Sequence, residues 1–368
     1  MTKEKQVQKA GDNSNQVQTQ TMIVNNYFGL SEDRAKELFG ELSSKMIEDA
    51  LCAGFEVATQ RIQKFQDEVI PRLKGLEEKF QSFNDPAFQV FIKKAQLSAA
   101  TSDREIDIEL LSELVAHRVN NKKDIKKKTS IEKAVEIINK IDYDALCGLT
   151  MFYSMCKFVP VSGSIEKGIQ DLNDLYEKCQ YEELPKDDEW LDNLDILNVV
   201  RKSFNSFEKF EDYLIEKFDG YVCVGIKVDS AEYVEFCNEL KRLDLEFILV
   251  NHELLDGYAR LLMPFKDSID KYIIENVVDG REIESEIVFS DEQKRCLKTI
   301  QGAYSKDVVL LNKVKEAFKN KLNSQNAIKK AIDWWNGLDN YFEVTSVGSV
   351  VAHVNAKRID DNIPDLDE

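Results

Sequence analysis

Residues 31–71 read SEDRAKELFGELSSKMIEDALCAGFEVATQRIQKFQDEVIP, and this stretch decides the fold class. It opens with Ser31, whose hydroxyl is suited to cap free backbone N–H groups, and with acids that favour the positive end of a helix. Apolar side chains then recur every three or four residues, at Ala35, Leu38, Phe39, Leu42, Met46, Ile47, Ala50, Leu51, Phe55, Ala58, Ile62, Phe65 and Val69. The pattern predicts one long amphipathic helix that Pro71 stops or kinks. Long helices of this kind usually pack in antiparallel pairs or form the stalk of an oligomer.

The helical pattern continues to residue 181. The predicted helices start at Asp85-Pro86, at Ser102 or Asp103 and at Ser130, and two more span Asp142–Phe158 and Ile165–Tyr181. The stretch from Asp142 to Phe158 is the most apolar, which predicts a buried helix. The best candidate for a membrane span, Ala145–Val161, is too short and is interrupted by Lys157 and Pro160.

The second half of the chain mixes both kinds of element. The acidic stretch Glu182–Asp188 predicts a linker, and Leu191–Phe218 is mostly helical. Two predicted strands follow at Tyr221–Val228 and Leu245–Val250, separated by a helix near Ala231–Arg242. The end of the chain then predicts three helices, a short strand and a last helix, an order that faintly suggests a winged helix.

The fold class is therefore mainly α, with a short N-terminal β segment, a small α+β part and a C-terminal helical part for which a winged-helix-like arrangement is an alternative. We expect an assembly segment, a helical domain, an α+β region, a C-terminal helical domain and a disordered acidic tail. Their predicted bounds are 1–30, 31–181, 189–289, 290–358 and 359–368.

The N-terminal segment is unusually polar. From Gln6 to Asn26, 12 of 21 residues are Gln, Asn, Ser or Thr, and β-branched residues alternate with Gln on both sides of a turn-forming cluster. Alternation around a turn favours a hairpin or one rung of a stacked β-structure, and Gln and Asn form ladders between identical chains. The segment therefore predicts homotypic assembly, with a disordered leader as the alternative. The candidate assembly residues are Gln8, Gly11, Asp12, Asn13, Gln16 and Gln18.

Composition excludes several classes of protein. The formal net charge of -18 argues against a protein that coats nucleic acid. Seven scattered cysteines, without a CxxC pair, argue against a disulfide framework or structural zinc, and favour a reducing compartment. The first 20 residues lack the apolar core of a signal peptide, so we expect a cytoplasmic protein without a membrane span.

Two ends of the chain resemble an uncharacterised bacterial family with locus-tag names. The resemblance rests on Gln8–Gln18 with its Gly-Asp-Asn-Ser core, on Phe83-Asn84-Asp85-Pro86, and on the end of the chain. That end contributes Val344-Thr345-Ser346-Val347-Gly348 and Ala352-His353-Val354-Asn355, although Leu is more usual than Val344. The resemblance implies a shared fold and a bacterial cytosol, and it implies no chemistry. Val7–Gly11 also resembles signalling-amyloid motifs, from which it departs by Lys9 and one inserted residue.

Candidate sites each have a structural alternative. His252-Glu253 after a strand suggests a general base with its orienting carboxylate, or a loop histidine beside a helix-starting acid. The lysines of 122–128 suggest a phosphate site or a solvated face. Trp334-Trp335 suggests core packing or base stacking. His117 and His353 lack metal-ligand spacing, so we expect packing roles, and we predict no metal, cofactor or catalytic residue.

These observations favour a self-assembling, non-enzymatic bacterial protein, with antiphage or stress defence as its setting by analogy. Its expected partner is itself, and a further protein partner is compatible with the sequence. One alternative is a DNA-binding regulator that uses the C-terminal helices. The other alternative is an enzyme with a site near His252 and Glu253.

Overall fold

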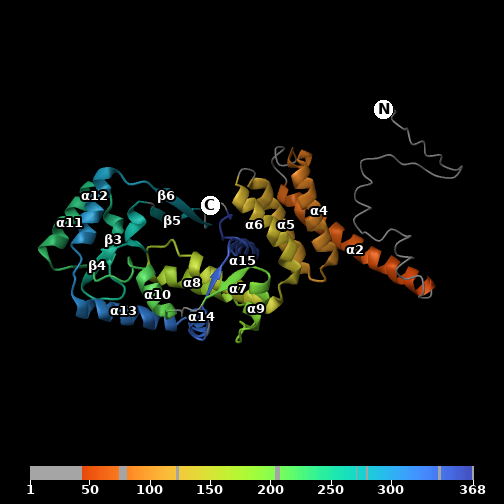
Figure 1. Cartoon of the computed structure of the whole chain (residues 1–368). Helices are drawn as coiled ribbons and strands as arrows, with labels where there is room; N and C mark the ends of the chain where they lie inside the picture. Colours follow the sequence, from red (N-terminus) through yellow and green to blue (C-terminus); the bar gives the residue numbers. More distant parts are fainter. Residues whose placement is uncertain are drawn as a thin grey trace, which may run out of the picture.

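The computed structural model describes residues 44–73, 81–121, 124–203, 208–270, 272–278, 281–338 and 341–366. It is mainly α-helical with a small α+β part, as the sequence predicts. Figure 1 shows an elongated molecule, with the helices from α2 to α6 at one end and the α+β part at the other. None of the helices in these ranges is long and apolar enough to cross a membrane.

The first half of the chain forms a block of helices. These are α2 (Ser44–Leu73), α4 (Pro86–Thr101), α5 (Glu105–Asn120), α6 (Ile125–Ile137), α7 (Tyr143–Lys157), α8 (Ile165–Cys179) and α9 (Glu189–Ile196). Helix α2 passes through Pro71 and ends two residues later, so the proline does not stop the helix where the sequence places the break. Helix α7 is buried from Ala145 to Met155, which confirms the predicted buried helix.

Side-chain caps explain where most of these helices begin. The carboxylates of Asp85 and Asp142 accept backbone N–H bonds at the starts of α4 and α7, and the Ser164 hydroxyl does so at α8. The prediction that Ser130 caps a helix is wrong. Asp124 caps α6 instead, and Ser130 lies inside that helix, where its hydroxyl donates to the Lys126 carbonyl.

The α+β part is built on a three-stranded antiparallel sheet. It contains β2 (Ile226–Lys227), α11 (Ala231–Arg242), β3 (Leu249–Asn251) and β4 (Tyr258–Leu261), with the strand order β2-β4-β3. Both predicted strands and the helix between them are present, although the strands are shorter than predicted. Strand β4 was not predicted; it pairs with each of the other two, so β2 and β3 are parallel to one another but are not neighbours.

Other strands pair outside this sheet. Strands β5 (Tyr272–Val278) and β6 (Arg281–Ile287) form an unpredicted hairpin. Strand β1 (Val200–Lys202) lies in a stretch predicted to be helical, ahead of α10 (Phe210–Lys217). It pairs with β7 (Phe342–Val344), the strand that suggested a winged helix. Because its partner comes from far back in the chain, β7 does not form the adjacent hairpin of a wing.

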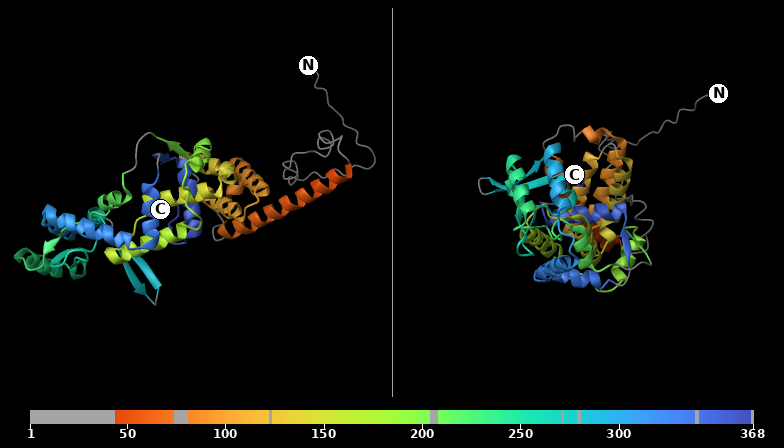
Figure 2. Two further views of the ribbon diagram at one scale, coloured as in Figure 1. Left: turned by 90° about the horizontal axis from the view of Figure 1, so that it is seen from below. Right: turned by 90° about the vertical axis from the view of Figure 1, so that its left-hand side faces the viewer.

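The last helices return the chain to its first half. They are α12 (Asp291–Gly302), α13 (Val308–Asn323), α14 (Asn326–Asn336) and α15 (Ser346–Ile359). Helix α15 packs against α5, α6 and α7, and Figure 2 shows it within the body of the molecule. One hydrophobic core accordingly runs from Phe65 to Ile363, and a second, smaller one gathers around β2–β4, α11 and α12. The buried clusters thus do not follow the order of the segments along the chain.

The prediction of a disordered acidic tail is wrong for residues 360–366. Ile363 is only 6% exposed and joins the main core, and Leu366 packs against it. Lys178 and Lys357 form ion pairs with Asp360 and Asp365, so acids that suggest a solvated tail are held by neighbouring cations. This segment, residues 360–366, is called the closing segment below.

The Thr-Ser-Val-Gly stretch at the start of α15 has a structural explanation. Thr345 caps the helix by accepting the Gly348 N–H, and its own hydroxyl donates to the backbone carbonyl of Asn198 or Val199. At Gly348 an added Cβ would lie 2.1 Å from the Val199 carbonyl oxygen, which is far closer than any real contact. The glycine therefore lets α15 approach the β1 strand.

We expect Gly348→Ala to lower the free energy of unfolding by about 2–3 kcal/mol, because backbone must move to admit the methyl group. Gly302→Ala is the matched control, since nothing lies within 4 Å of a Cβ at Gly302. Urea unfolding of both variants provides the comparison. Equal stability of the two variants would show that β1 and α15 can separate at little cost.

Candidate functional site

Helix α2 carries an apolar stripe that is buried at one end only. Phe65 and Val69 are 2% and 6% exposed, and they pack into the main core beside α4 and α5. Ten residues before Phe65, which is almost three helical turns, Phe55 of the same stripe is 58% exposed. Figure 2 shows the corresponding part of α2 projecting away from the body. The same sequence pattern therefore forms core at one end of the helix and surface at the other.

The spacing of this stripe is that of a coiled-coil seam. Residues 51, 55, 58, 62, 65 and 69 follow one another at alternating intervals of four and three residues. Such spacing keeps one side of a helix facing a parallel or antiparallel partner helix. Phe65 and Val69 of this seam pack into the main core, Ala58 and Ile62 are half-buried, and Phe55 is exposed.

Polar contacts fix the inner end of α2. The Arg72 guanidinium donates to Glu68 at 2.5 Å and to Glu113 of α5 at 3.0 Å, which raises the pKa of Arg72 despite its partial burial. Lys64 is paired with Glu105 at 2.7 Å. Because the base of α2 is held both by packing and by ion pairs, its projecting part has a defined direction.

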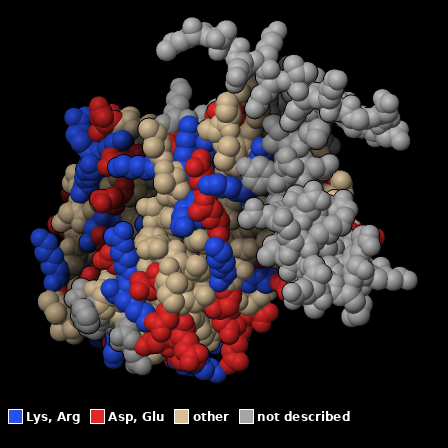
Figure 3. Space-filling view, turned by 45° about the vertical axis from the view of Figure 1, so that its right-hand side comes forward, with Lys and Arg blue, Asp and Glu red and all other residues tan. Residues whose placement is uncertain are grey.

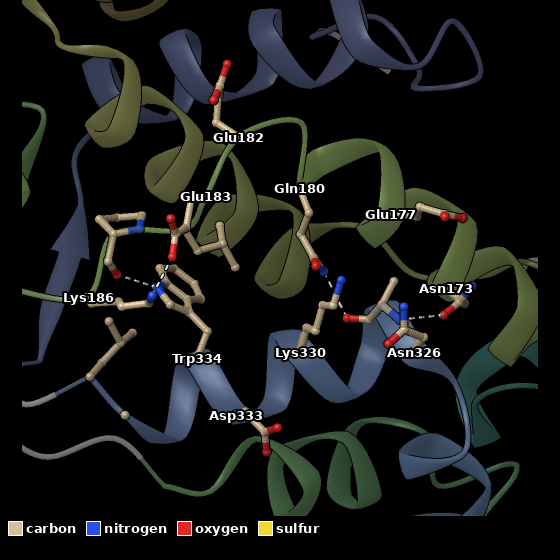
Figure 4. Close-up of a pocket in the computed structure, with 15 residues that line it drawn as sticks. Asn173, Glu177, Gln180, Glu182, Glu183, Lys186, Asn326, Lys330, Asp333 and Trp334 are labelled. Atoms are coloured by element: carbon tan, nitrogen blue, oxygen red, sulfur yellow. Dashed lines mark hydrogen bonds and ion pairs between the residues drawn. The ribbon is translucent and has the colours of Figure 1, made fainter.

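A groove lies between α8, the 180–186 loop and α14 (Figure 4). Its volume is about 810 Å³. The Trp334 indole donates to the Pro185 carbonyl at 2.8 Å, and Gln180 donates to the Ala327 carbonyl at 2.9 Å. Lys186 and Glu183 pair at one side. The polar side chains on the walls of this groove thus largely hold the loop onto the two helices.

The predicted pair His252 and Glu253 joins two parts of the fold. The Leu254 N–H donates to His252 Nδ1 at 3.1 Å, so His252 Nε2 carries the proton that it donates to the Cys223 carbonyl at 2.7 Å. Burial lowers the pKa of His252. With both ring nitrogens engaged by backbone, the imidazole has the environment of a neutral packing histidine.

Glu253 is paired with Arg260 rather than with the histidine. Two guanidinium nitrogens donate to its two carboxylate oxygens, each at 2.9 Å, and the Ile165 N–H donates to Oε1 at 3.0 Å. Burial raises the pKa of Glu253, but the ion pair and hydrogen bonds outweigh this effect, so its pKa lies below the usual value. Arg260 also donates to the Gly163 carbonyl at 2.7 Å. No sequence pattern pointed to Arg260, because it is a single arginine in a strand that was not predicted.

The two adjacent tryptophans lie in different surroundings. Trp335 is buried and stacks on Phe152, with ring centroids 4.9 Å apart and planes 8° apart. Trp334 is half-buried at the groove. The packing interpretation fits Trp335.

His117 and His353, far apart in the sequence, meet in the fold. Both are buried, and their rings lie edge to face with centroids 6.3 Å apart. His353 Nε2 donates to the Pro364 carbonyl of the closing segment at 2.9 Å. This contact between α5 and α15 could not be predicted from sequence spacing, because the two histidines are more than 200 residues apart.

The lysine run 122–128 lies at the start of α6. Lys126–Lys128 occupy its first turns, and Lys122 and Lys123 fall outside the described residues. Figure 3 shows Lys and Arg interleaved with Asp and Glu on one face of the molecule, so cations on that face do not merge into a continuous basic surface. DNA binding stays a prediction.

The candidate assembly residues Gln8, Gly11, Asp12, Asn13, Gln16 and Gln18 lie outside the described part of the chain. Within the described ranges, no three or more His, Cys, Asp or Glu side chains gather as they would around a metal ion.

Comparison with known proteins yields one match. The model of an uncharacterised family, which has a locus-tag-style name, matches residues 29–366. No curated protein and no solved structure matches this chain. The match covers most of the chain, including α2, the Thr-Ser-Val-Gly stretch and the whole closing segment, and it begins after the Gln-rich residues. The chain belongs to this uncharacterised family.

Proposed function

We propose that this protein is a self-assembling, non-enzymatic protein of the bacterial cytoplasm, in which contacts between copies involve the projecting part of α2 and the polar segment before it. The observation that carries the proposal is the change in burial along one stripe of α2, from 2% at Phe65 to 58% at Phe55. Defence against phage or stress is the setting that we propose, by analogy.

A second copy of α2 is the occupant that best suits this stripe. Identical helices with four-three apolar spacing pair with one another because each presents the same seam. The segment that precedes the helix is rich in Gln and Asn, which form ladders between identical chains. Pairing of the helices would bring those segments together at one end. The net charge of -18 disfavours an anionic partner such as nucleic acid or a lipid surface.

Charge placed on the stripe should dissociate the assembly. We expect the double variant Phe55→Glu/Ala58→Glu to have the 42.3 kDa mass of a single chain under conditions where the native chain is a multimer. Burial of one Phe contributes about 1.5–3 kcal/mol, so its loss alone weakens association by at least about tenfold. Light scattering at several concentrations measures the mass.

Gln60→Glu provides the matched control, because Gln60 is an exposed residue of the same helix away from the stripe. It should leave the mass unchanged. A chain that starts at Leu30 separates the two parts of the proposal. A smaller number of subunits than in the native chain would assign the contact to the polar segment, and an equal number of subunits would assign it to α2. A native chain of 42.3 kDa at all concentrations contradicts the proposal.

A further inference from the structure

The closing segment covers a buried pair of histidines. His353 donates to the Pro364 carbonyl at 2.9 Å, and Ile363 fills the main core beside it. The Tyr153 hydroxyl of α7 lies 3.4 Å from His353 Nδ1 and donates to it when the ring is neutral. The ring of His117, from α5, lies edge to face with the His353 ring, with centroids 6.3 Å apart. The segment therefore seals a site in which two titratable rings face one another.

The charged groups around this pair are few and come from several elements. Lys357 of α15 is paired with Asp365 of the closing segment, and its Nζ also donates to the Ile363 carbonyl at 3.2 Å. Glu113 of α5 lies 3.5 Å from His117 Nε2 and is shared with Arg72 of α2. Near neutral pH these charges balance in pairs. A proton on His353 adds a positive charge near Lys357.

We propose that the closing segment is an acid-sensitive latch, which stays docked while His353 is neutral and releases when it is protonated. Release exposes the His353 ring to water, which stabilises the imidazolium that the docked state buries. The inference is independent of the assembly proposal, because it concerns only how the closing segment binds to its own chain.

The direction of the effect follows from the docked geometry. Burial, which is the largest influence, and the charges of His117 and Lys357 lower the pKa of docked His353, although the Pro364 bond and Asp365 act in the opposite direction. A base whose pKa is lower when docked binds protons more readily when released, so docking is fully favoured above the ordinary value of about 6.5 and weakens as pH falls below it. One pH unit below 6.5, titration of His353 weakens docking by up to about tenfold.

Hydrogen-exchange mass spectrometry of the full chain at pH 7.5 and 5.5 tests this inference, with rates corrected for the intrinsic pH dependence of exchange. We expect protection of the peptide that covers residues 360–366 to fall by up to about tenfold at pH 5.5, while peptides of the buried helix α7 keep theirs. Unchanged protection of the closing segment in the native chain would overturn the proposal, as would an equal loss in α7.

A variant assigns the effect to His353. His353→Gln retains an N–H donor for Pro364 and does not titrate, so protection should persist at pH 5.5. His252→Gln is the matched control: this buried histidine also has a lowered pKa but contacts Cys223 and Leu254. An unaltered pH response in His353→Gln would show that other groups release the segment.

Discussion

Replacing Arg260 by Met is expected to lower the free energy of unfolding by about 3 kcal/mol, because it removes one partner of a buried ion pair. The Arg260 side chain is fully buried, whereas Glu253 keeps 23% of its side chain exposed, which places the cost at the lower end for such pairs. The variant also leaves the Gly163 carbonyl without its guanidinium donor. Urea unfolding followed by circular dichroism measures the loss.

Two further variants make this prediction sharp. Arg242→Met removes an arginine that pairs with Glu239 and Glu292 on the surface, and it should leave the unfolding midpoint unchanged. The double variant Glu253→Leu/Arg260→Met should recover part of the lost stability, because no charge is then left without its partner. A loss below about 1 kcal/mol in Arg260→Met would contradict a structural role for the pair.

The same pair gives the protein a defined response to acid. Because the pKa of Glu253 is lower in the fold than in the unfolded chain, its contribution is complete well above the ordinary value of about 4.3. It is lost as pH falls through the lower folded value. His252 contributes in the same direction at higher pH, since its pKa is also lowered.

The geometry does not fit His252 as a catalytic base paired with Glu253. A catalytic pair would need a free ring nitrogen near a substrate, whereas both His252 nitrogens are hydrogen-bonded to the backbone.

Helices were predictable from this sequence where a cap precedes an apolar pattern. Asp85, Asp142 and Ser164 each combine a capping side chain with a following amphipathic stretch, and the helices begin there. The cap predicted at Ser130 was wrong because the helix has already begun there. Asp124, six residues earlier, accepts the first free N–H groups of α6. Local chemistry decides these boundaries, so local sequence reveals them.

Strands and sites were harder to predict because their partners are distant. Strand β1 is three residues long and exists through its pairing with β7, which the sequence around Val200 does not encode. Likewise, His252 and Glu253 were recognisable as unusual neighbours, but their bonding to Cys223, Ile165 and Arg260 is a product of the fold. The apolar stripe of α2 was predicted, but the change in its burial depends on where α4 and α5 lie.

The second large effect is expected at Trp335, where substitution by Ala should lower the free energy of unfolding by about 3–5 kcal/mol. The indole stacks on Phe152 and lies 4.9 Å from the Phe210 ring, and its N–H donates to the Glu208 carbonyl at 3.0 Å. Its removal leaves a cavity at the centre of an aromatic cluster that joins α7, α10 and α14. Chemical unfolding at neutral pH measures the loss.

Trp334→Ala provides the matched control, because the neighbouring indole is half-buried and borders the groove. It should cost less than half as much, since water can occupy part of the space that it leaves. Trp335→Phe should fall between the two, because it keeps an aromatic ring against Phe152 and loses the bond to Glu208. Equal losses in both alanine variants would contradict this assignment, since a core role predicts that stability depends on which of the two adjacent indoles is removed.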